Sequence, residues 1–138
     1  MSKETGDLAL DSNAVIAYFL DDENTVAWIE SSDALFFPVI VVGEMEYGAL
    51  HSSRPKKNLK RLLGFLEQGT ILEVTRDTAR IYAEIRQSLA ISGKPIPEAD
   101  LWIGAVCLEN GLPLLSEDKH FRHVPGLKWR DWTKPVRI

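Results

Sequence analysis

Hydrophobic and polar positions form blocks along the chain that predict strands and helices in alternation. Short apolar runs, typical of buried strands, lie at residues 8–10, 34–37, 71–74 and 112–116. Segments with helical spacing lie between them, at about 14–20, 22–29, 39–50, 54–66, 78–91 and 98–109, and residues 121–132 form a short tail. Apolar strands alternating with helices favour a parallel sheet covered on both faces. The sequence therefore predicts one α/β domain over residues 1–138, with three layers, α/β/α, around a short central parallel sheet.

Four acidic residues stand next to these apolar segments, where a charge is costly unless a cation compensates it. Asp11 follows the first predicted strand and Asp118 follows the last apolar run, while Glu44 and Asp100 lie near the beginnings of helices. Ligand sites of parallel sheets form beyond the carboxyl ends of the strands, so the four acids can converge there. Carboxylate oxygens select hard cations such as Mg²⁺ or Mn²⁺, and no Cys/His cluster indicates zinc.

Each of the four acids also has a simpler interpretation. Asp11 is a favoured residue for a helix N-cap, and Asp100 complements the dipole of its helix in the first turn. Glu44 competes with Glu46, because helical periodicity does not choose between them, and Asp118 competes with Glu117 in a polar loop. The signal therefore lies in the arrangement of the four acids rather than in any one of them.

Composition limits the class of protein. The chain has 138 residues, 45% of them hydrophobic and 26% charged, with a formal net charge of −4. These values are typical of a soluble globular protein, and no apolar run is long enough to span a membrane. The single cysteine, Cys107, forms no internal disulfide, which favours a reducing, cytoplasmic location. Because the net charge is negative, binding of nucleic acid requires local basic patches or metal ions.

Four short motifs resemble those of PIN-domain ribonucleases, in particular the VapC-type toxins of bacterial toxin–antitoxin pairs. They are Asp11-Ser12-Asn13 after a strand, Glu44-Met45-Glu46-Tyr47-Gly48, Asp100-Leu101-Trp102-Ile103-Gly104, and Ser116-Glu117-Asp118-Lys119-His120-Phe121. Their order and spacing agree with the family over nearly the whole chain. The second motif favours Glu44 over Glu46. Ser116 and Gly104 stand where Thr and Ala are common, and neither departure removes a carboxylate.

The resemblance implies a metal-dependent RNA endonuclease. Asp11, Glu44, Asp100 and Asp118 would be its catalytic residues and would hold one or two Mg²⁺ or Mn²⁺ ions, directly or through water. The metal would supply a nucleophile at neutral pH and neutralise charge on the scissile phosphate. The resemblance also implies a homodimer and a cognate antitoxin that covers the acidic cleft.

Other polar and aromatic residues have weaker signals. The basic residues of segment 54–66 are interpreted first as a solvated helix face and second as phosphate contacts of RNA. Leu59, Leu62, Leu63 and Leu66 form the apolar stripe of that segment. Ser12, Asn13 and Ser116 are equally well explained as residues that orient carboxylates and as plain cap or turn residues. His120 has a minority interpretation as a phosphate contact. Tryptophans are expected in the core or at interfaces.

Two alternatives compete with the nuclease. The first is a catalytically silent PIN-like domain that binds RNA or protein, and retention of all four acids argues against it. The second is an aspartyl-phosphate enzyme of the haloacid-dehalogenase type, suggested by Asp11 after a strand. Those enzymes carry a second Asp two residues after the nucleophile, and Asn13 occupies that position here.

Overall fold

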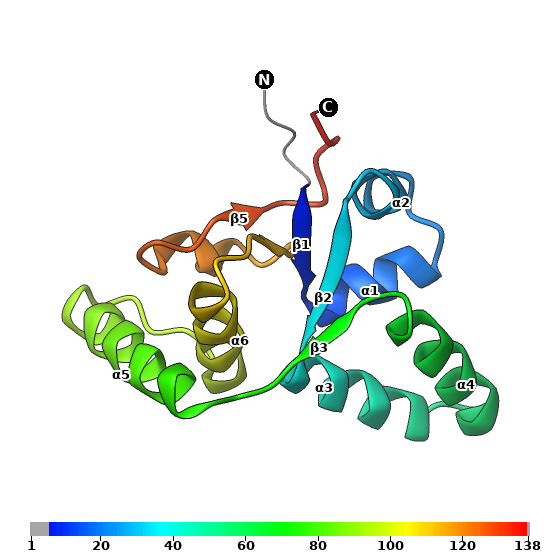
Figure 1. Cartoon of the computed structure of the whole chain (residues 1–138), viewed down its shortest axis with the longest axis horizontal. Coiled ribbons are helices and arrows are strands. Elements are labelled where there is room, and N and C mark those ends of the chain that lie inside the picture. Colours follow the sequence, from blue (N-terminus) through cyan, green and yellow to red (C-terminus); the bar gives the residue numbers. More distant parts are fainter. Residues whose placement is uncertain (1–5, 138) are drawn as a thin grey trace.

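The computed structural model describes residues 6–137 and shows a five-stranded parallel sheet with helices on both sides (Figure 1). The strands are β1 (Asp7–Leu10), β2 (Ala34–Pro38), β3 (Thr70–Leu72), β4 (Leu114–Leu115) and β5 (Trp129–Arg130). Their order across the sheet is β3-β2-β1-β4-β5, and every neighbouring pair is parallel. The predicted parallel sheet is confirmed, and the strands are short.

Within residues 6–137, six α-helices and one 3₁₀ helix connect the strands. They are α1 (Ser12–Phe19), α2 (Glu23–Glu30), α3 (Val39–Leu50), α4 (Pro55–Leu66), α5 (Arg76–Ile91), α6 (Glu98–Glu109) and the 3₁₀ helix η1 (Lys119–His123). Figure 1 shows α1, α2 and α4 on one side of the sheet and α5 and α6 on the other. Among the described residues, no helix has the length and apolar character required to cross a membrane.

Alternate residues of the strands supply two cores, one on each face of the sheet. Leu8 and Leu10 pack with α1, α2 and α4, whereas Ala9, between them, packs with α5 and α6. This alternation follows from the two-residue period of a β-strand. Helix α3 contributes to both cores, through Val42 to the first and Val41 to the second. The predicted three-layer α/β/α architecture is therefore confirmed.

The predicted apolar stripe of α4 was wrong at one position. In α4, Leu63 is exposed, and Phe65 takes its place in the core beside Leu62 and Leu66. Phe65 faces the core because its ring packs against the rings of Tyr18, Phe19 and Phe37.

Helix α5 begins at Arg76 rather than at residue 78. Thr75 caps it and forms a reciprocal capping box with Thr78. A threonine at the third helical position is an uncommon partner in this motif, which is why the sequence pattern did not show the start of the helix.

Candidate metal centre

Asp11 is the most buried acid of the site. It follows β1 and is 2% exposed. One carboxylate oxygen, Oδ1, accepts a hydrogen bond from the backbone N–H of Ser12 at 2.8 Å and so caps α1. The other oxygen, Oδ2, accepts from Ser116 Oγ at 2.7 Å and from Asn13 Nδ2 at 3.3 Å. The N-cap interpretation and a role in the site are therefore compatible, since each uses a different oxygen.

Asp118 enters the site from the loop after β4. Strand β4 is the neighbour of β1 in the sheet, so the residues that follow the two strands lie side by side. Asn13 Nδ2 donates to Asp118 Oδ2 at 3.3 Å, and the backbone N–H of Asp118 donates to Ser116 Oγ at 3.0 Å. Ser116 and Asn13 thus connect Asp118 to Asp11.

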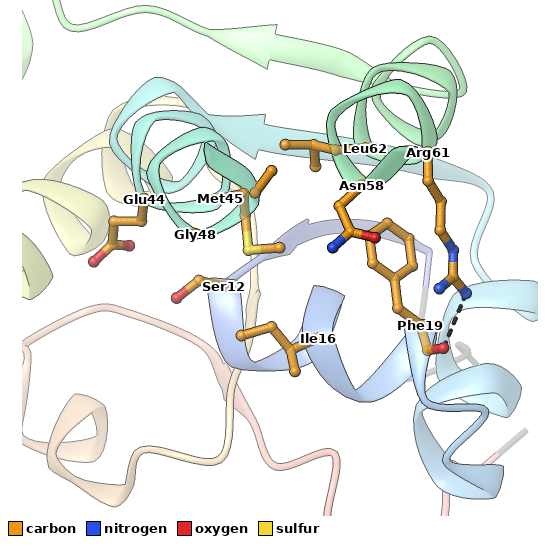
Figure 2. Close-up of a pocket in the computed structure, with 10 residues that line it drawn as sticks. Ser12, Ile16, Phe19, Glu44, Met45, Gly48, Asn58, Arg61 and Leu62 are labelled. Carbon is orange, nitrogen blue, oxygen red and sulfur yellow. Dashed lines mark hydrogen bonds between the residues drawn. The ribbon is translucent and has the colours of Figure 1, made fainter. Parts of the chain in front are cut away.

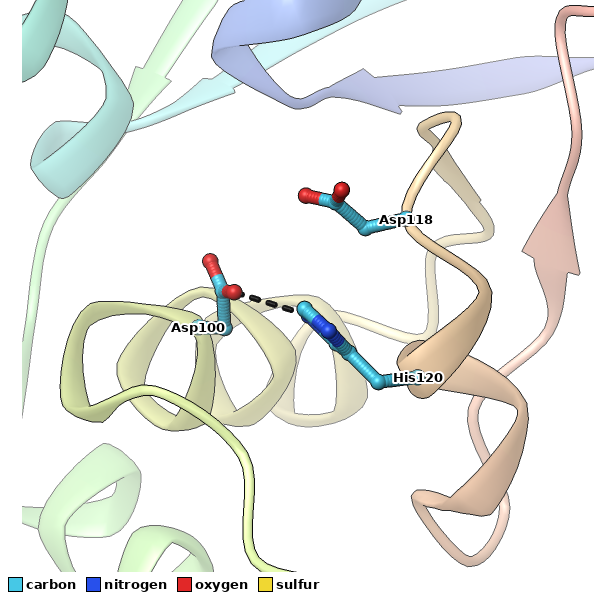
Figure 3. A group of neighbouring side chains, drawn as sticks. All are labelled: Asp100, Asp118 and His120. Carbon is cyan, nitrogen blue, oxygen red and sulfur yellow. Dashed lines mark ion pairs between the residues drawn. The ribbon is translucent and has the colours of Figure 1, made fainter.

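Asp100 completes a compact group with Asp118 and His120 (Figure 3). It lies in the first turn of α6, and its side chain is 14% exposed. His120 Nε2 is buried and lies 2.8 Å from Asp100 Oδ2, and the two side chains point toward each other. One possible ligand atom from each of the three residues lies within 4.8 Å of the others. The sequence did not show that His120 pairs with Asp100, because this contact depends on how η1 folds back over α6.

Glu44 lies on α3 and lines a hollow of about 390 Å³ next to Ser12 (Figure 2). It is more exposed than the other acids and is not part of the compact group of Asp100, Asp118 and His120. Its carboxyl group is nevertheless within electrostatic range of that group. Burial raises the pKa of Glu44, and the charges of Asp100 and Asp118 raise it further, whereas a hydrogen bond with Ser12 lowers it.

Burial, and to a lesser extent neighbouring charges, raise the pKa values of Asp11, Glu44 and Asp100. Burial raises the pKa of Asp11 from 3.8 to about 6; hydrogen bonds from Ser116 and Ser12 oppose this, and the charges of Asp100 and Asp118 add to it. Burial also raises the pKa of Asp100, where the proximity of His120 acts in the opposite direction and Asp118 in the same direction. Close carboxylates disfavour one another's ionised form, and a divalent cation relieves that repulsion.

The donor set fits a hard divalent cation. It consists mainly of carboxylate oxygens, which suit Mg²⁺ and Mn²⁺, with the imidazole of His120 beside them. The structure brings Asp11, Asp100 and Asp118 to one end of β1 and β4, and Glu44 approaches them from α3.

Comparison with known proteins assigns the family. The family profile of the PIN domain matches residues 8–127. The chain belongs to the PIN-domain family. It is 34% identical to ribonuclease VapC2 of Haemophilus influenzae over 94 residues, which is 67% of this chain and 71% of that protein. It is 30% identical to the tRNA(fMet)-specific endonuclease VapC of Shigella flexneri over 95 residues, 68% of this chain and 72% of that protein.

Solved structures agree with this assignment. One is VapBC-5 from Mycobacterium tuberculosis, a member of the VapBC family of toxin–antitoxin systems. It superposes on this PIN domain with a TM-score of 0.69 and 26% sequence identity, covering 90% of this chain and 95% of that one. The resemblance inferred from the four motifs is thus confirmed.

Proposed function

We propose that this PIN-domain protein is a metal-dependent RNA endonuclease, a VapC-like toxin, whose four carboxylates hold Mg²⁺ or Mn²⁺. The observation that carries the proposal is the convergence of Asp11, Asp100 and Asp118, with Glu44 beside them, at the carboxyl ends of adjacent strands. Family membership and the ribonuclease relatives support RNA as the substrate.

In this mechanism the protein side chains bind the ion and hold the site in place. Asp11, Asp100 and Asp118 would bind the ion, and Glu44 would do so directly or through water. When bound, such an ion would supply the Lewis acidity needed to activate a water molecule and to neutralise charge on the scissile phosphate. Asn13 and Ser116 hold Asp11 and Asp118 in fixed relation. His120 lies beside the carboxylate of Asp100, with Nε2 at 2.8 Å from Asp100 Oδ2.

The hollow next to Glu44 supports an antitoxin as the natural inhibitor. Helices α1, α3 and α4 line it with apolar side chains, among them Ile16, Phe19 and Met45, and Ile16 is half exposed (Figure 2). Ser12, which follows Asp11 in the chain, and Glu44 also line the hollow. We propose that an apolar segment of the antitoxin fills this hollow and that a basic side chain reaches the carboxylates. The toxin–antitoxin system among the structural neighbours supports such a partner.

The test is cleavage of end-labelled total RNA and of purified initiator tRNA by antitoxin-free protein, with Mg²⁺ or Mn²⁺ against EDTA. Asp100→Asn should lower the cleavage rate by at least about 100-fold, because loss of residues that only support a metal site already costs about 10–100-fold. Asp77→Asn is the matched control, since Asp77 occupies the first turn of α5 as Asp100 occupies that of α6.

Three outcomes would contradict the proposal. Cleavage that persists in EDTA would exclude the metal mechanism, and an Asp100→Asn variant with a normal rate would exclude the assigned site. No cleavage of any RNA by metal-loaded protein would favour the catalytically silent domain. In the same assay, the protein encoded by the adjacent reading frame should stop cleavage if it is the antitoxin.

The homodimer, the cytoplasmic location and the single domain over residues 1–138 stay predictions. Residues 1–5 and 138 lie outside the described part of the chain. Sedimentation equilibrium of the purified protein would measure the oligomeric state directly.

A further inference from the structure

Two tryptophans beyond the family match donate hydrogen bonds to the site. The PIN-domain match ends at residue 127, and Trp129 and Trp132 follow it. The indole N–H of Trp129 donates to the backbone oxygen of Ser116 at 2.9 Å. The indole N–H of Trp132 donates to the side-chain oxygen of Asn13, also at 2.9 Å, across 119 positions of sequence. The C-terminal segment therefore contacts the residues that connect the carboxylates.

The contact of Trp132 fixes which way the Asn13 amide points. Asn13 Oδ1 accepts from Trp132 Nε1 and from the backbone N–H of Glu117 at 3.1 Å. Two N–H donors at one end of an amide require its oxygen there, so the NH₂ group must face the opposite way. That group lies 3.3 Å from Asp11 Oδ2, 3.2 Å from Ser116 Oγ and 3.3 Å from Asp118 Oδ2.

The orientation matters because two of the three partners of the NH₂ group are carboxylates. In the observed orientation, Asn13 places its donors between Asp11 and Asp118 and so offsets part of their mutual repulsion. A rotated amide would place its oxygen against the same two carboxylates and add to the repulsion. Trp132 supplies one of the two hydrogen bonds that disfavour the rotated state.

We propose that Trp132 is a positioning residue, which fixes the amide of Asn13 and thereby holds Asp11 and Asp118 in the geometry that binds a divalent cation. The proposal rests on the proposed metal-dependent function. In this proposal Trp132 acts through Asn13, to which it donates its indole N–H.

The first test is Mn²⁺ binding to metal-free protein, measured from the electron paramagnetic resonance signal of free Mn²⁺ without RNA. Trp132→Phe keeps an aromatic ring but removes the N–H, and it should weaken Mn²⁺ binding about 10-fold, as expected for a residue that supports a metal ligand. Trp28→Phe is the matched control. Trp28 also donates its indole N–H to the C-terminal segment, but to Lys134 O, at 2.9 Å, rather than to Asn13.

A merely structural role of Trp132 predicts a different result. If both tryptophans only anchor the C-terminal segment, the two variants should weaken Mn²⁺ binding equally, and that result would overturn the proposal. A second comparison uses Asn13→Ala. In the Asn13→Ala background, Trp132→Phe should cause no further loss of affinity. A full additional 10-fold loss would show that Trp132 does not act through Asn13.

Nuclear magnetic resonance of the Asn13 side-chain amide tests the orientation without metal or RNA. In metal-free protein, Trp132→Phe should shift or broaden the Asn13 NH₂ resonances, whereas Trp28→Phe should leave them unchanged. Unchanged resonances in Trp132→Phe would refute the proposal even if the protein is a nuclease. Wild-type protein that binds no Mn²⁺ would refute the metal centre instead, so the two failures are distinguishable.

Discussion

Replacing Asp11 by asparagine should stabilise the metal-free protein at neutral pH while it abolishes the nuclease. Asp11 is 2% exposed and lies near two other carboxylates, and burial raises its pKa from 3.8 to about 6. Its ionised form is therefore less favourable in the folded chain than in the unfolded chain. If the site needs this charge to bind metal, the charge lowers the free energy of unfolding whenever the metal is absent.

The two pKa values give the size and the sign of the effect. Because the folded pKa is the higher one, the stability that the protonated carboxyl contributes is fully present below about pH 4. It is lost as the pH rises through about 6. The difference corresponds to about 3 kcal/mol. Asparagine removes the charge but turns one acceptor into a donor facing Ser116 and Asn13, which costs about 1–2 kcal/mol. The expected net gain at pH 7.5 is about 1–2 kcal/mol.

The assay is thermal unfolding in EDTA between pH 4 and pH 8, followed by circular dichroism. At pH 7.5, Asp11→Asn should melt about 3–7 °C above the wild type, and the difference should vanish or reverse near pH 4. Asp7→Asn, at the exposed start of the same strand, is the matched control and should change the melting temperature little. An Asp11→Asn variant that is less stable than the wild type by the same amount at every pH would refute the electrostatic reasoning.

Two further predictions concern the fold and the RNA interface. Gly69→Ala should lose about 1–3 kcal/mol of stability, because its Cβ would lie 2.5 Å from Leu35 O and 2.7 Å from a Phe37 ring carbon. Gly64 has open space around it, so Gly64→Ala should instead stabilise α4. A chemical denaturation curve for each variant measures this, and equal effects would contradict it. Lys60→Ala should leave the salt dependence of RNA binding unchanged, since we interpret the exposed face of α4 as solvated. A slope reduced by about 0.7 would show a phosphate contact instead.

The layers of the fold were predictable because they depend on periodicity. Apolar runs placed four of the five strands, and the position of Asp11 directly after one of them placed the site at the carboxyl end of the sheet. Helix α4 shows the limit of this reasoning. Its apolar residues cover more than one face, and the choice of Phe65 over Leu63 is made by aromatic partners that are distant in sequence.

The contacts that hold the carboxylates in place were less predictable. The bond from Trp132 to Asn13 joins residues 119 positions apart and leaves no periodic signal. The pairing of His120 with Asp100 also depends on side-chain placement rather than on spacing. Asn13 and Ser116 were recognisable as candidates from their motifs, but a cap or turn explained them equally well until their hydrogen-bond partners were known.

The strand order explains why acids so far apart in sequence share one site. Strand β1 lies between β2 and β4 in the sheet. The chain therefore continues from β1 to β2 on one side of β1 and returns later as β4 on its other side. Such a reversal of strand order opens a crevice at the carboxyl ends of the two adjacent strands, where helices depart to opposite faces. Asp11 follows β1 and Asp118 follows β4, so both lie at this end of the sheet, where the charge of Asp118 acts on Asp11. Burial is the largest cause of the raised pKa of Asp11, and the charges of Asp100 and Asp118 add to it, while hydrogen bonds from Ser116 and Ser12 oppose it only in part. The remaining unfavourable charge is what a divalent cation can neutralise, and the position of the site follows from the topology of the sheet.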